Sequence, residues 1–259
     1  PEAWLDEIRK QVAVVGMTEQ GRHRGVDTVD LNEQRSAADI MKYLHDLGHR
    51  HIAYMGVIDD RHPSVVAAES FGKIEPWQLA SMLSQAPRNG AWLNYATRNI
   101  DPMRLTLAIM PRQWATDSLE QVTDRTIDRV CAQSPRPTAI VVVSSPCAGV
   151  MIDRLAQRGL RVPQDIGVLT YGGLHVENHH EHTVCTLRQP TREIAQLASE
   201  MIQRRLADPD ALPLSVRLDG ELIPGESLHA IEDMAENEAI VATRQQHQFE
   251  SNESVSPPP

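Results

Sequence analysis

Short apolar runs alternate along the chain with longer stretches in which apolar residues recur every three or four positions, as far as about residue 228. A short apolar run predicts a buried strand, and a period near 3.6 predicts an amphipathic helix. The expected strands are residues 12–16, 51–56, 105–110, 139–143, 166–171, 184–187 and 214–218. Strands that alternate with helices are typical of an α/β protein with parallel, doubly wound sheets.

Four helices are expected between these strands, over residues 34–47, 117–133, 148–158 and 191–206, and a further helix is expected to end near residue 99. Gly48 and Gly159 follow two of these helices, where a glycine can adopt the left-handed conformation that ends a helix. Residues 57–87 show no clear period. In parallel sheets of this kind, ligands bind beyond the carboxyl ends of the strands.

Composition narrows the function classes. The 259 residues are 41% hydrophobic, which is enough for a core, and the formal net charge is -10, which argues against a nucleic-acid surface on this chain. The three cysteines lack metal-ligand spacing and are expected to be free thiols in a reducing cytosol. The chain shows neither a signal peptide nor an apolar run long enough to span a bilayer, so a cytoplasmic location away from membranes is expected.

Three sequence blocks occur in order and carry a resemblance to a known family. They are PTAIVVVSSPCAGVMIDRLAQRGLRVPQDIGVLTYGG (137–173), DLNEQRSAADIMKYLHDLGHRHIAYMG (30–56) and TVCTLRQPTREIAQLASEMIQRRL (183–206). Together they resemble the effector-binding core of LacI/GalR-type bacterial transcription regulators. The likeness covers about Val12 to Leu228, and the family's DNA-binding headpiece and the first strands of its first lobe have no counterpart, which implies an amino-terminally truncated core.

The resemblance implies two doubly wound parallel-sheet lobes of the periplasmic-binding-protein-like type I, with the first lobe incomplete. By that likeness the first lobe holds residues 1–56 and 188–213, and the second holds residues 57–187 and 214–228. The chain would cross between the lobes near Gly56, Leu187 and Pro213. Residues 229–259 are polar and acidic and are expected to form a disordered tail.

The same resemblance implies a ligand site between the lobes. Relatives use an Asn-Asp pair, a later Asp and an Arg; the corresponding residues here are Ser144 and Ser145, Gly172, and Arg88. Tyr171, which precedes the glycine pair, completes the set of candidate ligand-binding residues. Without the carboxylates a typical pyranose is not expected, and three interpretations stay open: altered specificity, a degenerate pocket, or misalignment.

Other constellations were weighed against this site. His175, His179, His180 and His182 surround two glutamates, but the spacing is not that of a zinc motif and a solvated loop is the favoured interpretation. The chain contains neither a G-x-S-x-G nucleophile elbow nor a phosphate-binding loop. No metal, cofactor or catalysis is therefore expected.

The sequence thus favours the ligand-sensing core of a transcription regulator. The expected partners are a small sugar-like or purine-like effector, operator DNA through the missing headpiece, and a second copy of the chain in a homodimer. A free-standing periplasmic-type solute-binding protein is the main alternative, and an enzyme on an α/β scaffold is the other.

Overall fold

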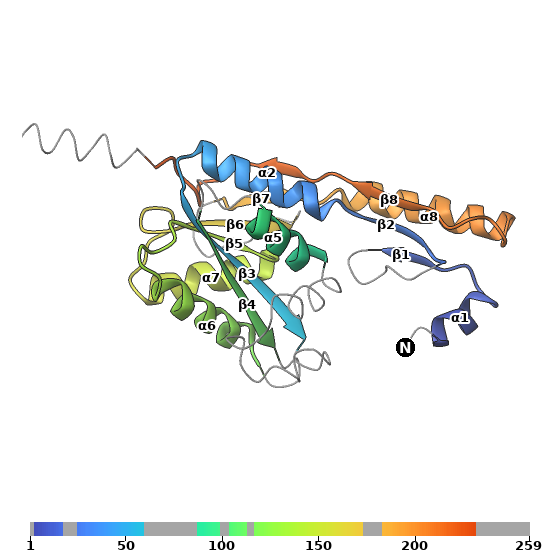
Figure 1. Ribbon diagram of the computed structural model, residues 1–259, viewed down its shortest axis with the longest axis horizontal. Coiled ribbons are helices and arrows are strands. Elements are labelled where there is room, and N and C mark those ends of the chain that lie inside the picture. Colours follow the sequence, from blue (N-terminus) through green and yellow to red (C-terminus); the bar gives the residue numbers. More distant parts are fainter. Residues whose placement is uncertain are drawn as a thin grey trace, which may run out of the picture.

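The computed structural model describes residues 3–17, 25–59, 87–98, 104–112, 117–172 and 183–231. The larger of its two sheets has six strands, in the order β4-β3-β5-β6-β7-β9 (Figure 1). All neighbouring strands in it are parallel except β9, which runs antiparallel to β7. The strands are β3 (His51–Asp59), β4 (Arg104–Arg112), β5 (Ala139–Val142), β6 (Gly167–Gly172), β7 (Cys185–Arg188) and β9 (Glu221–Ile223).

A second, three-stranded parallel sheet has the order β1-β2-β8 and lies beside the first (Figure 1). Its strands are β1 (Val15–Met17), β2 (Asp27–Leu31) and β8 (Ser215–Leu218). Helix α8 (Thr191–Ala207) packs on this sheet, and the short helix α1 (Ala3–Arg9) precedes it in the chain. Two helix-covered parallel sheets confirm the expected α/β class.

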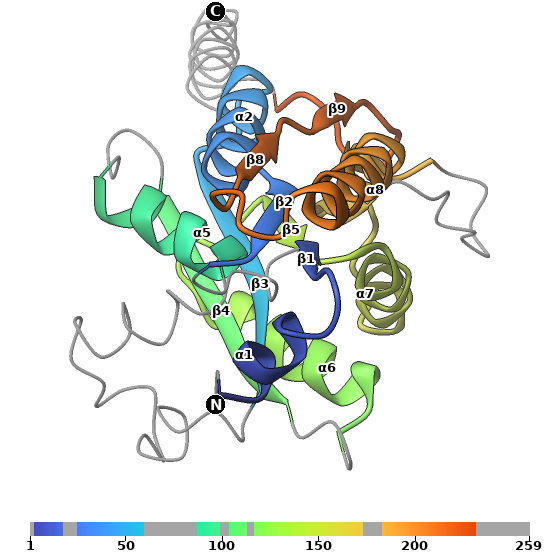
Figure 2. The ribbon, with the colours of Figure 1, turned by 90° about the vertical axis from the view of Figure 1, so that its right-hand side faces the viewer.

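Helices cover both faces of the six-stranded sheet. Helices α2 (Glu33–Asp46) and α5 (Pro87–Arg98) pack on one face, and α6 (Leu119–Cys131) and α7 (Ser145–Gln157) pack on the other (Figure 2). The middle of strand β3 is apolar because both of its faces are buried: Tyr54 belongs to the first buried cluster and Met55 to the second. A strand buried on both faces loses the polar alternation of a half-exposed strand.

Two helix ends confirm local signals in the sequence. Gly48 and Gly159 follow α2 and α7 with φ of +87° and +76°, the left-handed region that glycine adopts without a steric cost. Within the described ranges, no helix is long and apolar enough to span a membrane.

The sheet membership of two segments differs from the lobe boundaries expected from the sequence. Residues 51–56, expected in the first lobe, form most of β3 in the six-stranded sheet, hydrogen-bonded to both β4 and β5. Residues 214–218, expected in the second lobe, include β8, which pairs with β2 in the smaller sheet. The chain therefore passes between the two sheets three times: between β2 and α2, at residue 32; between β7 and α8; and between β8 and β9.

Two elements were not expected: α1 and β2. Helix α7 also begins three residues earlier than expected, at Ser145, because Pro146 suits the first turn of a helix, where no backbone N–H bond is lost. Of the expected disordered tail, residues 229–231 are described, and the Ile231 N–H donates to the Leu47 carbonyl at 2.7 Å. Residues 232–259 lie outside the described residues.

Candidate functional site

Four of the five predicted ligand-binding residues lie at the ends of neighbouring strands. Ser144 is the N-cap of α7 and Ser145 its first residue, just after β5, while Tyr171 and Gly172 end β6. The Ser145 hydroxyl donates to the Tyr171 carbonyl at 3.4 Å. A Cβ added to Gly172 would lie 1.8 Å from Ser145 Oγ, so the close approach of these two segments requires a glycine. The carboxyl edge of the sheet thus gathers the four residues.

Arg88, the fifth residue, comes from the first turn of α5 and joins this group. Its Nη1 donates to the Val143 carbonyl at 2.8 Å, and its guanidinium carbon lies 4.2 Å from the centre of the Tyr171 ring. Its Nε and Nη2 donate to the two carboxylate oxygens of Glu33 at 3.1 and 2.9 Å. Such a two-pronged pairing is the strongest geometry available between arginine and a carboxylate.

The Tyr171 ring packs against the Arg88 guanidinium and does not face solvent. The residue is fully buried, and its hydroxyl accepts a hydrogen bond from Trp92 Nε1 at 3.0 Å. Trp92 stacks on Tyr54 with ring centres 4.8 Å apart, and the Tyr54 hydroxyl donates to Asn89 Oδ1 at 2.7 Å. This aromatic group leaves Ser144, Ser145, Gly172 and Arg88 as the partly exposed members of the predicted set.

Sequence reasoning missed Glu33, Asn89, Trp92 and Tyr54. Glu33 is the first residue of α2, where an acidic side chain is ordinary because it complements the helix dipole. Asn89 and Trp92 belong to α5, and the chain immediately before that helix has no period that predicts a fold. The one signal that could have pointed to Glu33 as a site residue was its position directly after Asn32, in a sequence block that carries the family resemblance.

The Glu33–Arg88 pair is the main electrostatic feature of the site. The side chains are 5% and 14% exposed, so both charges are largely removed from water and each depends on the other. The pair makes this part of the site formally neutral. We expect the removal of either partner to remove the two-pronged pairing that the other charge makes here.

Two kinds of side chain bear on the chemistry of this region: metal-ligating groups and thiols. Among the described residues, His, Cys, Asp and Glu side chains form no group of three that could hold a metal ion, and the histidine-rich segment 175–182 lies outside them. Burial raises the pKa of the Cys185 thiol to about 11, so that thiol stays protonated at neutral pH and is a poor nucleophile. The Ser144 hydroxyl lies 3.2 Å from Cys147 Sγ.

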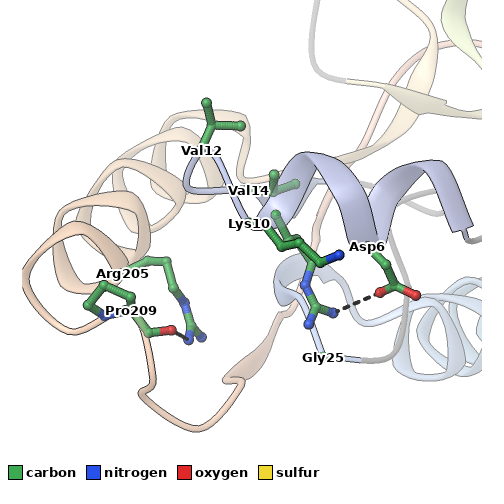
Figure 3. A pocket seen from close by; sticks show the side chains of 8 residues that line it. Asp6, Lys10, Val12, Val14, Gly25, Arg205 and Pro209 are labelled. Carbon is green, nitrogen blue, oxygen red and sulfur yellow. Dashed lines mark hydrogen bonds and ion pairs between the residues drawn. The ribbon is translucent and has the colours of Figure 1, made fainter.

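A cavity of about 350 Å³ lies elsewhere, beside the smaller sheet (Figure 3). Its lining comes from α1, the chain before β1, Gly25 and the end of α8, and it includes none of the five predicted residues. Arg9 and Arg205 reach it, but Arg9 pairs with Asp6 at 3.6 Å and Arg205 with the buried Asp27 at 2.9 Å. Its cationic side chains therefore already have partners within the chain.

Known proteins resemble this chain over most of its described length. Residues 41–228 match the family model described as periplasmic binding protein-like domain. The HTH-type transcriptional repressor PurR of Vibrio parahaemolyticus is 24% identical over 184 residues, which are 71% of this chain and 47% of the repressor. The chain thus spans less than half the length of that relative, and 26% of the PurR repressor of Aliivibrio fischeri.

Solved structures show the same fold. A LacI transcriptional regulator from a Rhodococcus species superposes with a TM-score of 0.69 at 18% identity, over 89% of this chain and 75% of that one. A LacI family transcriptional regulator from Enterococcus faecium, solved with bound ribose, gives a TM-score of 0.58 at 17% identity, over 84% and 71% of the two chains. The matched region and the shared fold lead to one assignment: this chain belongs to the periplasmic binding protein-like domain family, and it has the fold of LacI-family transcriptional regulators.

Proposed function

We propose that this chain is the ligand-sensing core of a bacterial transcription regulator and that it binds a small polar effector at the carboxyl edge of the six-stranded sheet. The observation that carries the proposal is the meeting of Ser144, Ser145, Gly172 and Arg88 at one edge, although Arg88 and Gly172 stand 84 positions apart. Hydroxyls and a guanidinium together suit a ligand rich in hydroxyl or ring nitrogen groups. The effector is therefore sugar-like or purine-like.

The lobes give this site a way to transmit binding. The chain crosses between the two sheets at three places. Two of these crossings are joined by a hydrogen bond, in which Asn32 Nδ2 donates to Asp219 Oδ1 at 2.8 Å. We infer that these crossings form a hinge and that the effector binds one lobe arrangement more tightly than the other. A ligand shifts such an equilibrium only by its differential affinity, typically worth about 1–3 kcal/mol of coupling.

The partners follow from the same proposal. The formal net charge of -10 disfavours direct contact with a polyanion, so operator DNA is bound through a headpiece that is not part of this chain. The core forms a homodimer, as suits operators with two half-sites. Relatives that are repressors support a regulator over a free-standing solute-binding protein or an enzyme.

A substitution that blocks the site tests this proposal. Ser145→Leu places a bulky side chain where Gly172 leaves room only for a hydroxyl, so it should abolish stabilisation by an effector. Circular dichroism identifies whether the variant keeps the parent's fold, which the comparison requires. Ser199→Ala, on the exposed face of α8, is the matched control. Thermal unfolding against a panel of neutral sugars, nucleobases and nucleosides, with ribose included, finds the effector, and calorimetry measures its affinity. If Ser145→Leu binds that effector as tightly as the parent chain, the site assignment is wrong.

A further inference from the structure

The guanidinium of Arg88 already holds a carboxylate supplied by the chain itself. The edge formed by Nε and Nη2 is the one that grips carboxylates and phosphates with two parallel hydrogen bonds. In this chain both atoms of that edge donate to Glu33, at 3.1 and 2.9 Å. An anionic ligand could use the same edge only after Glu33 had moved away.

Moving Glu33 away is unfavourable for a structural reason. Glu33 is the first residue of α2, and its side chain is 5% exposed, so a carboxylate released from Arg88 has little access to water. A largely buried charge that loses its partner is strongly destabilising. The Arg88 guanidinium is itself fixed by the Val143 carbonyl and by the Tyr171 ring, so it cannot turn to offer another edge without losing these contacts.

We propose that Glu33 is a specificity-determining residue: as the internal counter-ion of Arg88, it makes the site select uncharged polar ligands and reject carboxylates and phosphates. The inference rests on the proposed function of this site as an effector site. It adds the charge class of the ligand, which the candidate residues Ser144, Ser145 and Gly172 leave undetermined. It also explains how an arginine is kept at the carboxyl edge without attracting the phosphates and carboxylates of the cell.

The test uses inorganic phosphate as the anionic probe, at constant ionic strength, with binding measured by thermal unfolding and calorimetry. The parent chain should show no saturable binding. Glu33→Gln keeps the size of the side chain and removes its charge, so it should bind phosphate saturably, at least about tenfold more tightly than the detection limit set for the parent, because no carboxylate then occupies the Nε–Nη2 edge of Arg88. The double variant Glu33→Gln/Arg88→Met should lose this gain.

Asp39→Asn is the matched control, because it removes a carboxylate from an exposed arginine pair on the same helix, Arg35–Asp39, and it should leave phosphate binding unchanged. If Glu33→Gln does not fold by circular dichroism, Glu33→Ala takes its place. An aspartate keeps the negative charge beside Arg88, so Glu33→Asp should gain no phosphate binding, and Glu33→Ala, which removes the charge, should gain it. Saturable phosphate binding by the parent chain overturns the proposal. So does the absence of a gain in the folded Glu33→Gln or Glu33→Ala variant, or a gain that survives the loss of Arg88.

The two proposals fail in different ways. If no neutral ligand in the panel binds the parent chain, the proposed function loses its support, whereas the phosphate result still reports on Glu33 and Arg88 alone. If an anionic effector binds the parent chain, and Arg88→Met abolishes that binding, the proposed function stands and the role given to Glu33 is wrong.

Discussion

Ser227 ties the end of the six-stranded sheet to the segment that follows β9, and its loss should be costly. The residue is 2% exposed. Its hydroxyl accepts a hydrogen bond from the Cys185 N–H at 2.8 Å and donates one to the Val168 carbonyl at 2.6 Å, thus joining β7 to β6. Ser227→Ala leaves a buried backbone donor without its partner and weakens the bonding of a buried acceptor. Each such buried group costs roughly 1–3 kcal/mol, so the variant should lose about 2–4 kcal/mol of unfolding free energy.

Urea unfolding followed by far-ultraviolet circular dichroism measures this loss. Ser199→Ala, on the exposed face of α8, should stay within about 0.5 kcal/mol of the parent chain and is the control for removing a serine hydroxyl. Native-state hydrogen exchange adds a local test, because the Cys185 amide should exchange faster in Ser227→Ala than in the parent. If the two serine variants have equal stability, these hydrogen bonds do not stabilise the fold as argued.

Three further predictions concern buried groups. Burial lowers the pKa of His49 from 6.5 to about 4, so between these pH values the unfolded chain binds a proton at this residue and the folded chain does not. About 2–3 kcal/mol of unfolding free energy should therefore be lost as the pH falls from 6.5 to 4. Acid titration of His49→Gln should show a smaller loss of stability over the same range. Gly48→Ala should cost more than Gly159→Ala in the same urea assay, although both glycines have positive φ, because only the first Cβ meets a backbone atom, the Ile231 oxygen at 2.4 Å; about 1–2 kcal/mol is expected for Gly159→Ala, and equal costs would rule out this clash. Asp27→Asn should destabilise the smaller sheet by about 3–5 kcal/mol, because the fully buried carboxylate pairs with two arginines of α8; hydrogen exchange that speeds up first in the six-stranded sheet would contradict this.

The elements with local signals were predictable from the sequence, and those that depend on distant partners were not. Helices α2, α6 and α8 carry a clear apolar period, and Gly48 marks the end of α2. Strand β2 was missed because Asp27 and Asp30 interrupt its apolar residues. Asp27 is tolerated there because arginines about 177 positions later neutralise it, a pairing that no local pattern reveals. The expected lobe boundaries differ from the sheets for the same reason, since β8 joins β2 by long-range pairing.

The candidate site follows the same rule. Ser144, Ser145 and Gly172 come together because parallel strands end at a common edge, which a sequence pattern can predict once the strands are recognised. The contacts of Tyr171 were not predictable, because its hydroxyl accepts a hydrogen bond from Trp92 and its ring lies against Arg88, and both partners are distant in sequence. Glu33 was not predicted as a site residue because its ion pair with Arg88 depends on how α2 and α5 pack against each other.

The pairing of β2 with β8 also bears on how the chain is made. Thr28 lies beside Ser215 in the sheet, 187 positions later in the chain, and their side chains hydrogen-bond at 2.9 Å. When a ribosome has synthesised β2, nearly all of the six-stranded sheet must still be translated before the partner strand exists. Strands β3 to β7 lie closer together in sequence and can pair earlier, since closing a shorter loop costs less entropy. The smaller sheet therefore receives its third strand only after β3 to β7 have been synthesised, and until then the edge of β2 that will pair with β8 is open to aggregation and to chaperones.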